Sequence, residues 1–202
     1  MKAALILAVL VGTAFAPLKV QDTFKTDDEG FIRNWLVLAP IPIEEGAAAQ
    51  EIDKSQLKDE GKIKPKAGDK VTVNKKDLAW KAHKTADFYI DFKESFDKNA
   101  GEDVAGYAVA YVWAEAEMKD VKLKVGSNDQ CKAYLNGKDA LKFDETRTLE
   151  KDQNDATVTL NKGENVLVFK VINEKNNWQG CARFTDKTGA AIKTLKIALA
   201  PQ

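Results

Sequence analysis

The residues best suited to contacting a ligand lie in the segment EKNNWQGC, near the carboxyl end of the chain. Trp178 offers a flat ring that could stack on a sugar, and the amides of Asn176, Asn177 and Gln179 offer hydrogen bonds to hydroxyl groups. A loop of this composition indicates a carbohydrate-binding site. The alternative, which we favour for the ring itself, is that Trp178 folds back as a lid over the hydrophobic core.

Charged residues in two other segments are further candidates. Arg147 and Asp152 lie in TRTLEKDQND and Asp129 lies in SNDQ, where they could contact an acidic or polyhydroxy ligand. A surface ion pair that pins the loop is the simpler interpretation of Arg147 and Asp152. Asp129 is open to the same two interpretations.

Residues for catalysis or metal binding are not grouped in this sequence. The single histidine, His83, stands in the polar stretch KAHKTAD, and none of the serines lies in a Gly-x-Ser-x-Gly motif. No spacing singles out two carboxylates as an acid–base pair. The cysteines are far apart and form no Cys-x-x-Cys motif. We therefore expect a protein that is not an enzyme and that holds no metal and no cofactor.

The amino-terminal residues MKAALILAVLVGTAFA combine a lysine, an apolar run and small residues, which is typical of a secretory signal peptide over residues 1–16. Cleavage is expected after Ala14 or Ala16. The apolar run is too short to span a bilayer, so we expect a secreted or periplasmic protein that does not span the membrane after processing. Residues 17–29 are then an N-terminal linker, and residues 30–202 form one domain with a full core.

The charges exclude one class of partner. Lysine plus arginine equals aspartate plus glutamate, 31 each, and the two signs are interspersed along the chain. Nucleic-acid binders carry a concentrated basic face, which this sequence lacks. We therefore expect no nucleic-acid partner.

Cys131 and Cys181 are a candidate disulfide, because they form an even pair in a chain expected to reach an oxidising compartment. In the alternating pattern of CKAYL, Cys131 faces inward, whereas Cys181 shares its face with Arg183 and points the other way. Simple alternation therefore opposes the bond. A β-bulge near Gly180 would reverse the parity, so both outcomes stay open here.

Short segments of alternating polarity, separated by turns, fill most of the remaining sequence. CKAYLNGKDALKF predicts a hairpin at Asn136–Gly137, and TVTLNKGENVLVFKVIN predicts a second hairpin around residues 161–164. Residues 44–61 differ, because helix-forming residues with few large apolar side chains indicate a short helical or irregular excursion. These patterns predict an all-β fold, an antiparallel β-sandwich or barrel.

The order of several motifs resembles the galactose-binding-like jelly-roll modules of exported bacterial proteins. The motifs are the Ser-Asn-Asp turn at 127–129, the Leu-Asn-Gly hairpin at 135–137, the Lys-Gly-x-Asn turn at 162–165, and Trp178 followed by Arg-Phe-Thr-Asp at 183–186. The resemblance runs from about Gly30 to Leu199. It implies a jelly-roll sandwich and non-catalytic binding of carbohydrate through loops at one end of the sandwich.

The chain departs from this family at one turn. The family turn typically has the order Ser-Asp-Asp-Gly, whereas this chain has Asn128, Asp129 and Gln130 after its serine. Loss of a carboxylate and a glycine weakens any calcium role, because a hard cation requires several oxygen ligands, carboxylates among them.

Two functions are therefore expected. The first is binding of a polysaccharide or glycan by a non-catalytic module. The second is a structural or interaction domain of the cell envelope, which binds an envelope protein and has no sugar ligand. The second draws its support from the absence of a strong ligand constellation and from the layout, since the resembling modules mostly form one piece of a larger protein whereas a lone domain is expected here.

Overall fold

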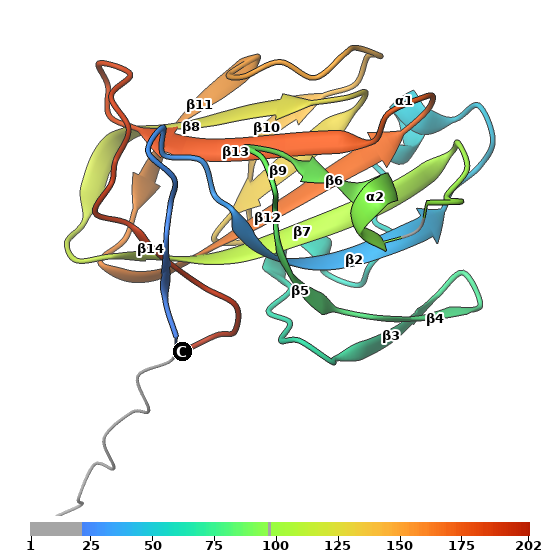
Figure 1. Ribbon diagram of the computed structural model, residues 1–202, viewed down its shortest axis with the longest axis horizontal. Coiled ribbons are helices and arrows are strands. Elements are labelled where there is room, and N and C mark those ends of the chain that lie inside the picture. Colours follow the sequence, from blue (N-terminus) through green and yellow to red (C-terminus); the bar gives the residue numbers. More distant parts are fainter. Residues whose placement is uncertain (1–21, 97) are drawn as a thin grey trace, which may run out of the picture.

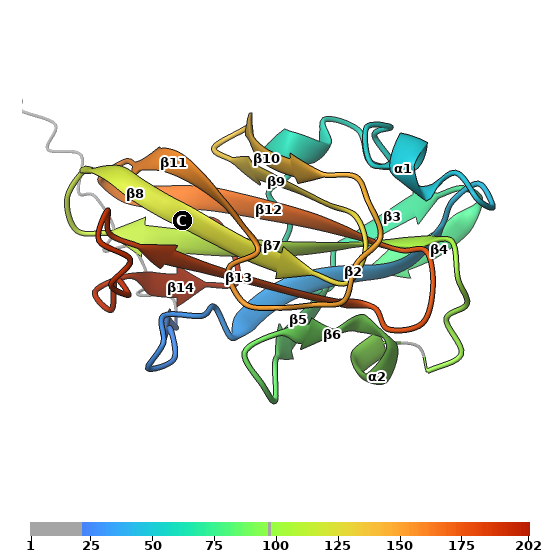
Figure 2. The same ribbon diagram turned by 90° about the horizontal axis from the view of Figure 1, so that it is seen from above.

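The computed structural model describes residues 22–96 and 98–202, so the predicted signal peptide lies outside the described residues. The fold is all-β, with antiparallel sheets arranged as a sandwich (Figures 1 and 2). The larger sheet contains, in spatial order, β1 (Phe24–Lys25), β14 (Lys196–Ala198), β7 (Val104–Ala114), β12 (Gly163–Asn173), β9 (Cys131–Leu135) and β10 (Lys138–Phe143). Two further strands extend it: β2 (Asn34–Pro42) pairs with β7, and β5 (Lys81–Lys84) pairs with β2. The smaller sheet has the order β11 (Asn154–Leu160), β8 (Met118–Ser127), β13 (Gln179–Thr185) and β6 (Ile90–Asp91).

The central strands β7 and β12 are buried on both faces, which creates two hydrophobic cores. Along β7, Ala108, Ala110 and Val112 point toward the smaller sheet, while Tyr107 and Tyr111 point to the opposite face. Side chains alternate between the faces of a strand, so one strand supplies both cores. The inner core holds the two sheets together.

The outer core lies between the larger sheet and an excursion of the chain. This excursion contains the short helices α1 (Ala48–Glu51) and η1 (Glu60–Lys62) and the separate hairpin of β3 (Lys70–Val73) and β4 (Lys76–Ala79). Ile52, Leu57, Val73 and Trp80 from this segment are buried against the sheet. The helical excursion predicted for residues 44–61 is confirmed, and it covers a sheet face that would otherwise be exposed. A second helix, α2 (Phe92–Phe96), follows β6.

A buried lysine fastens the excursion to the sheet. Lys170 of β12 is fully buried, and its ammonium donates hydrogen bonds to the carbonyl oxygens of Glu51 (2.8 Å), Ile52 (3.3 Å) and Lys54 (2.6 Å). Glu60 lies 3.8 Å from the same ammonium. Burial lowers the pKa of Lys170 to about 8.

The predicted hairpins have different outcomes. The Asn136–Gly137 hairpin is confirmed, since β9 and β10 pair directly across this turn. The hairpin predicted around residues 161–164 is wrong, because β11 belongs to the smaller sheet and β12 to the larger one. This turn carries the chain from one sheet to the other. At the amino-terminal side, Phe24 and Lys25 pair with β14, so part of the segment expected to be a linker adds a strand to the larger sheet.

Candidate functional site

Three loops that connect the two sheets meet at one end of the sandwich. They are the turn from β8 to β9, the loop from β10 to β11, and the loop from β12 to β13. A hollow of about 330 Å³ lies among them, lined by Asn128, Asp129, Thr146, Arg147, Thr148, Glu174, Lys175 and Asn176. The structure thus brings together three of the sequence-predicted residues, Asp129, Arg147 and Asn176.

Asp129 holds the three loops in place. It is 4% exposed and has a left-handed backbone, with φ of 62°. One carboxylate oxygen accepts hydrogen bonds from the backbone N–H groups of Glu174 (2.9 Å) and Lys175 (3.0 Å), and the other accepts from the backbone N–H of Arg147 (3.3 Å). Its carboxylate therefore satisfies backbone donors of two neighbouring loops, which makes Asp129 a positioning residue.

Arg147 also forms hydrogen bonds that hold the protein's own loops in place. Its guanidinium donates to the carbonyl (3.2 Å) and hydroxyl (2.9 Å) oxygens of Ser127 and to the side-chain oxygen of Asn154 (2.6 Å). The ring of Phe143 lies 3.6 Å from the guanidinium carbon. Burial lowers the pKa of Arg147. Asp152 lies elsewhere, where Arg183 and Lys124 are its ion-pair partners, so the loop is pinned at two separate points.

The prediction that Trp178 contacts a ligand is wrong. Its side chain is 1% exposed and packs in the inner core, where it stacks on Phe92 with ring centroids 4.8 Å apart. The indole N–H donates to the carbonyl oxygen of Val171 at 3.2 Å. Gly106 makes room for the ring, because a Cβ at that position would lie 2.7 Å from it. The alternative, a tryptophan folded back on the core, is the one that the structure adopts.

The amides beside Trp178 are separated from one another. Asn176 lines the hollow, and its carbonyl oxygen accepts a hydrogen bond from Lys93. Asn177 is exposed and does not line the hollow. Gln179 begins β13 and donates to the carboxylate of Asp91 at 3.1 Å, also away from the hollow. The predicted cluster of amides around one ring therefore does not form.

The residue that sequence reasoning missed is Asn128. It is 6% exposed, and its side-chain oxygen is buried without a hydrogen-bond partner, although its backbone N–H donates to Gln179 at 2.8 Å. Buried polar atoms nearly always have partners, so an exception at the wall of a hollow is informative. The only sequence signal was its place in a polar turn, which the turn itself already explains.

The candidate disulfide between Cys131 and Cys181 is not formed, and both thiols are free and buried. The register between β13 and β8 continues through Gly180 without a bulge, so Cys181 stays on the outer face of its sheet while Cys131 lies in the inner core. Burial raises the pKa of both thiols, that of Cys181 to about 12. The alternation that opposed the bond in the sequence also holds in the structure.

The remaining candidates for chemistry are the acidic side chains and His83. Within residues 22–96 and 98–202, no group of three or more histidine, cysteine, aspartate or glutamate side chains is arranged to hold a metal ion. His83 is half-buried and meets the ring of Phe96 edge-on, with centroids 5.1 Å apart, and burial lowers its pKa. In the same described part of the chain, no helix has the length and apolar character needed to cross a membrane.

Comparison with known proteins gives a distant likeness to solved structures. No family model and no curated protein matches the chain. The PA14 domain of the MpAFP antifreeze protein aligns with a TM-score of 0.40 and 11% identity, over 93% of this chain and 98% of that chain. A beta-glycosidase from Bacteroides vulgatus (TM-score 0.35, 11% identity) and a beta-glucuronidase from an uncultured Clostridium sp. (0.33, 11%) align over 78% and 81% of this chain. These alignments cover only 20% and 31% of the two enzyme chains.

Proposed function

We propose that this protein is an exported, non-catalytic module that binds a carbohydrate in the hollow where the three loops meet. The observation that carries the proposal is that Asn128, a residue that lines this hollow, has a buried side-chain oxygen without a hydrogen-bond partner. Such an atom loses its hydration without gaining a hydrogen bond, which is costly. A ligand hydroxyl would supply the missing donor.

The chemistry of the lining favours a neutral polyhydroxy ligand. Asp129 and Glu174 balance Arg147 and Lys175 in formal charge. Hydroxyl groups from Thr146 and Thr148 and the amide of Asn176 add both donors and acceptors. With Trp178 buried in the core, no indole ring lines this hollow, so recognition would depend on hydrogen bonds and affinity would be modest.

The charged groups of the hollow are already engaged in hydrogen bonds within the protein, which favours binding over catalysis. The carboxylate of Asp129 accepts three backbone hydrogen bonds, and the guanidinium of Arg147 is held by Ser127 and Asn154. A general acid or base must exchange protons with its substrate, which requires a group within reach of the reacting atom. Groups that fasten loops together are poorly placed for this task.

Affinity-gel retardation tests the proposal. The purified protein is run through native gels that contain a broad set of neutral polysaccharides, beside Asn128→Ala and a control, Thr159→Ala, on the exposed side of β11. We expect retardation of the wild type and of the control, and an affinity about tenfold lower for Asn128→Ala, as for the loss of one buried hydrogen bond. Because the Asn128 side chain makes no hydrogen bond in the described chain and its buried oxygen is costly, its removal should not lower the temperature of thermal unfolding.

Two results would contradict the proposal. If no polysaccharide retards the wild type, carbohydrate binding is removed and the envelope-protein alternative is favoured, which pull-down from an envelope fraction would then address. If Asn128→Ala is retarded as strongly as the control, a sugar is bound elsewhere on the molecule.

A further inference from the structure

A second hollow lies beside strands β1, β2 and β5 of the larger sheet, and the residues that line it carry a different net charge. It has a volume of about 550 Å³ and is formed by β1, the loop that follows it, the start of β2 and the end of β5. Lys25, Arg33 and Lys84 contribute three cations to its lining, against one carboxylate, Asp27. Lys25 and Lys84 are exposed, and neither has an ion pair within residues 22–96 and 98–202. The hollow therefore has an excess of positive charge in a chain whose net charge is zero.

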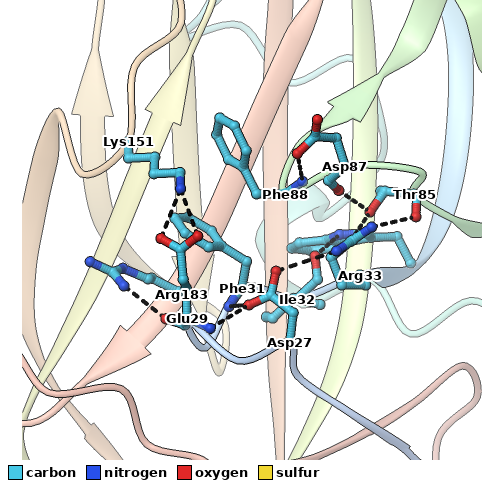
Figure 3. Close-up of polar contacts among 11 residues, drawn as sticks. Asp27, Glu29, Phe31, Ile32, Arg33, Thr85, Asp87, Phe88, Lys151 and Arg183 are labelled. Atoms are coloured by element: carbon cyan, nitrogen blue, oxygen red, sulfur yellow. Dashed lines mark hydrogen bonds and ion pairs between the residues drawn. The ribbon is translucent and has the colours of Figure 1, made fainter.

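Arg33 belongs to the lining of this hollow, and Figure 3 shows its contacts with Thr85 and Asp27. Its guanidinium donates to the hydroxyl (2.7 Å) and carbonyl (3.0 Å) oxygens of Thr85 and lies 3.4 Å from the carboxylate of Asp27. Thr85 is fixed in turn, since its hydroxyl donates to the carbonyl oxygen of Asp87 at 2.6 Å. An arginine has five N–H donors, and three are used here, so two remain for a ligand.

Asp27 cancels only one of the three positive charges, because its carboxylate is the ion-pair partner of Arg33. One of its oxygens accepts the backbone N–H groups of Glu29 (3.0 Å) and Phe31 (2.8 Å), while the other faces Arg33. The carboxylate is thus occupied in shaping the loop. The ammonium groups of Lys25 and Lys84 are left uncompensated at the mouth of the hollow.

Two polar side chains in the lining lack partners. Asn34 is 6% exposed, and its amide makes no hydrogen bond within the described chain. The hydroxyl oxygen of Thr26 is buried without a partner. Asn34 pairs in register with Lys84 across β2 and β5, so the two residues are neighbours on adjacent strands. Both orphaned groups can donate a hydrogen bond.

We propose that this basic hollow is a binding site for an oxyanion, the carboxylate or sulfate group of an acidic ligand. Three cations and the polar side chains of Thr26 and Asn34 line one hollow, and charge-assisted hydrogen bonds to anionic oxygens are the strongest that such groups form. The guanidinium is preorganised by Thr85, so less conformational entropy is lost on binding. This site is separate from the loop-end hollow, which is the hollow among the three loops that connect the sheets, and it is independent of the neutral ligand proposed there.

The test is an NMR titration of the full purified chain at low ionic strength, with binding constants from calorimetry. The probes are trigalacturonate for carboxylate, sodium sulfate for a free oxyanion, and neutral maltotriose. We expect amide shifts at Thr26, Asn34 and Lys84 with the two anions and none there with maltotriose, and weaker binding as salt is added. Shifts with sulfate alone identify a free anion as ligand, and stronger binding of trigalacturonate identifies an acidic glycan.

Matched variants separate a site from general attraction to positive charge. Lys25→Gln/Lys84→Gln should weaken anion binding about tenfold, as expected for the loss of two exposed ion pairs. Lys187→Gln/Lys193→Gln removes the same charge from exposed positions elsewhere and should bind as the wild type does. Equal binding by both double variants, or anion shifts scattered over the surface without Asn34 and Lys84, would overturn the proposal.

Discussion

Replacing Lys170 with methionine should destabilise the fold by removing the cation that fastens the excursion to the larger sheet. Methionine fills a similar volume but has no N–H donor, so the carbonyl oxygens of Glu51, Ile52 and Lys54 all lose their bond to the ammonium. The lysine is fully buried, so water cannot easily replace it. The excursion is the segment expected to loosen first.

The size of the effect comes from two opposing contributions. Three carbonyl groups, two of them buried and one partly buried, lose their donor at a cost of about 2 kcal/mol each, or about 6 kcal/mol together. Against this, the variant no longer buries a charge. The pKa of Lys170 falls from 10.5 to about 8 on folding, and at 1.36 kcal/mol per pH unit this burial costs about 3 kcal/mol at neutral pH. The net destabilisation expected at pH 7 is about 3 kcal/mol.

The pH dependence follows from the same lowered pKa. Between pH 8 and 10.5, the unfolded state holds a proton on Lys170 more often than the folded state does, so the lysine's contribution to stability increases with pH. From pH 8 to pH 9.5, the difference between wild type and Lys170→Met should grow by about 2 kcal/mol. The buried tyrosines and thiols titrate in both proteins, so their effects cancel in this difference.

Urea unfolding followed by circular dichroism at pH 7, 8 and 9.5 measures these free energies, with Lys187→Met as the control for loss of an exposed lysine. The control should stay within about 0.5 kcal/mol of the wild type. A Lys170→Met variant within about 1 kcal/mol of the wild type at pH 7, or a difference that is constant with pH, would refute the reasoning.

Three further outcomes are expected. Trp178→Ala should destabilise the fold by about 4 kcal/mol in urea unfolding, because it empties a stacked core position; an unchanged free energy of unfolding would contradict its place in the core. Without reductant, thiol titration should count two reactive groups in the denatured protein and almost none in the folded one, since Cys131 and Cys181 are free and buried; no thiols after denaturation would establish the disulfide. Mass spectrometry of the protein from its native host should find the amino terminus at Phe15 or Pro17, and an intact Met1 in a cytoplasmic fraction would overturn the proposed export.

Local patterns predicted the parts of the fold that depend on local geometry. Asn136–Gly137 specifies a tight turn with positive φ at both positions, which joins two paired strands. The turn at residues 161–164 has similar chemistry, yet it leads from β11 in one sheet to β12 in the other. A turn motif fixes the change of direction but not which sheet receives the next strand, because that depends on partners far away in the sequence.

The site was harder to predict than the fold for the same reason. Trp178 stands among amides in the sequence, but the space left by Gly106 and the ring of Phe92, which lie more than seventy residues earlier, decide that it points inward. The hollow combines residues from three loops, and sequence reasoning found Asp129, Arg147 and Asn176 without indicating that they meet. Lys170, in the apolar run of β12, gave no signal of the carbonyl groups that surround it.

The polar residues of the loop-end hollow are of two kinds. Some hold the loops in place, and the others are candidates for binding a ligand. Each of its three loops crosses from one sheet to the other, so their backbone groups lie beyond the ends of the strand ladders and need other partners. Asp129 and Arg147 meet that need, since their side chains form hydrogen bonds to other loops and strand ends. Asn128 has no such task, because its side-chain oxygen holds nothing in place. Because the fold does not explain this unpaired oxygen and Asn128 lines the hollow, binding should be tested first at Asn128.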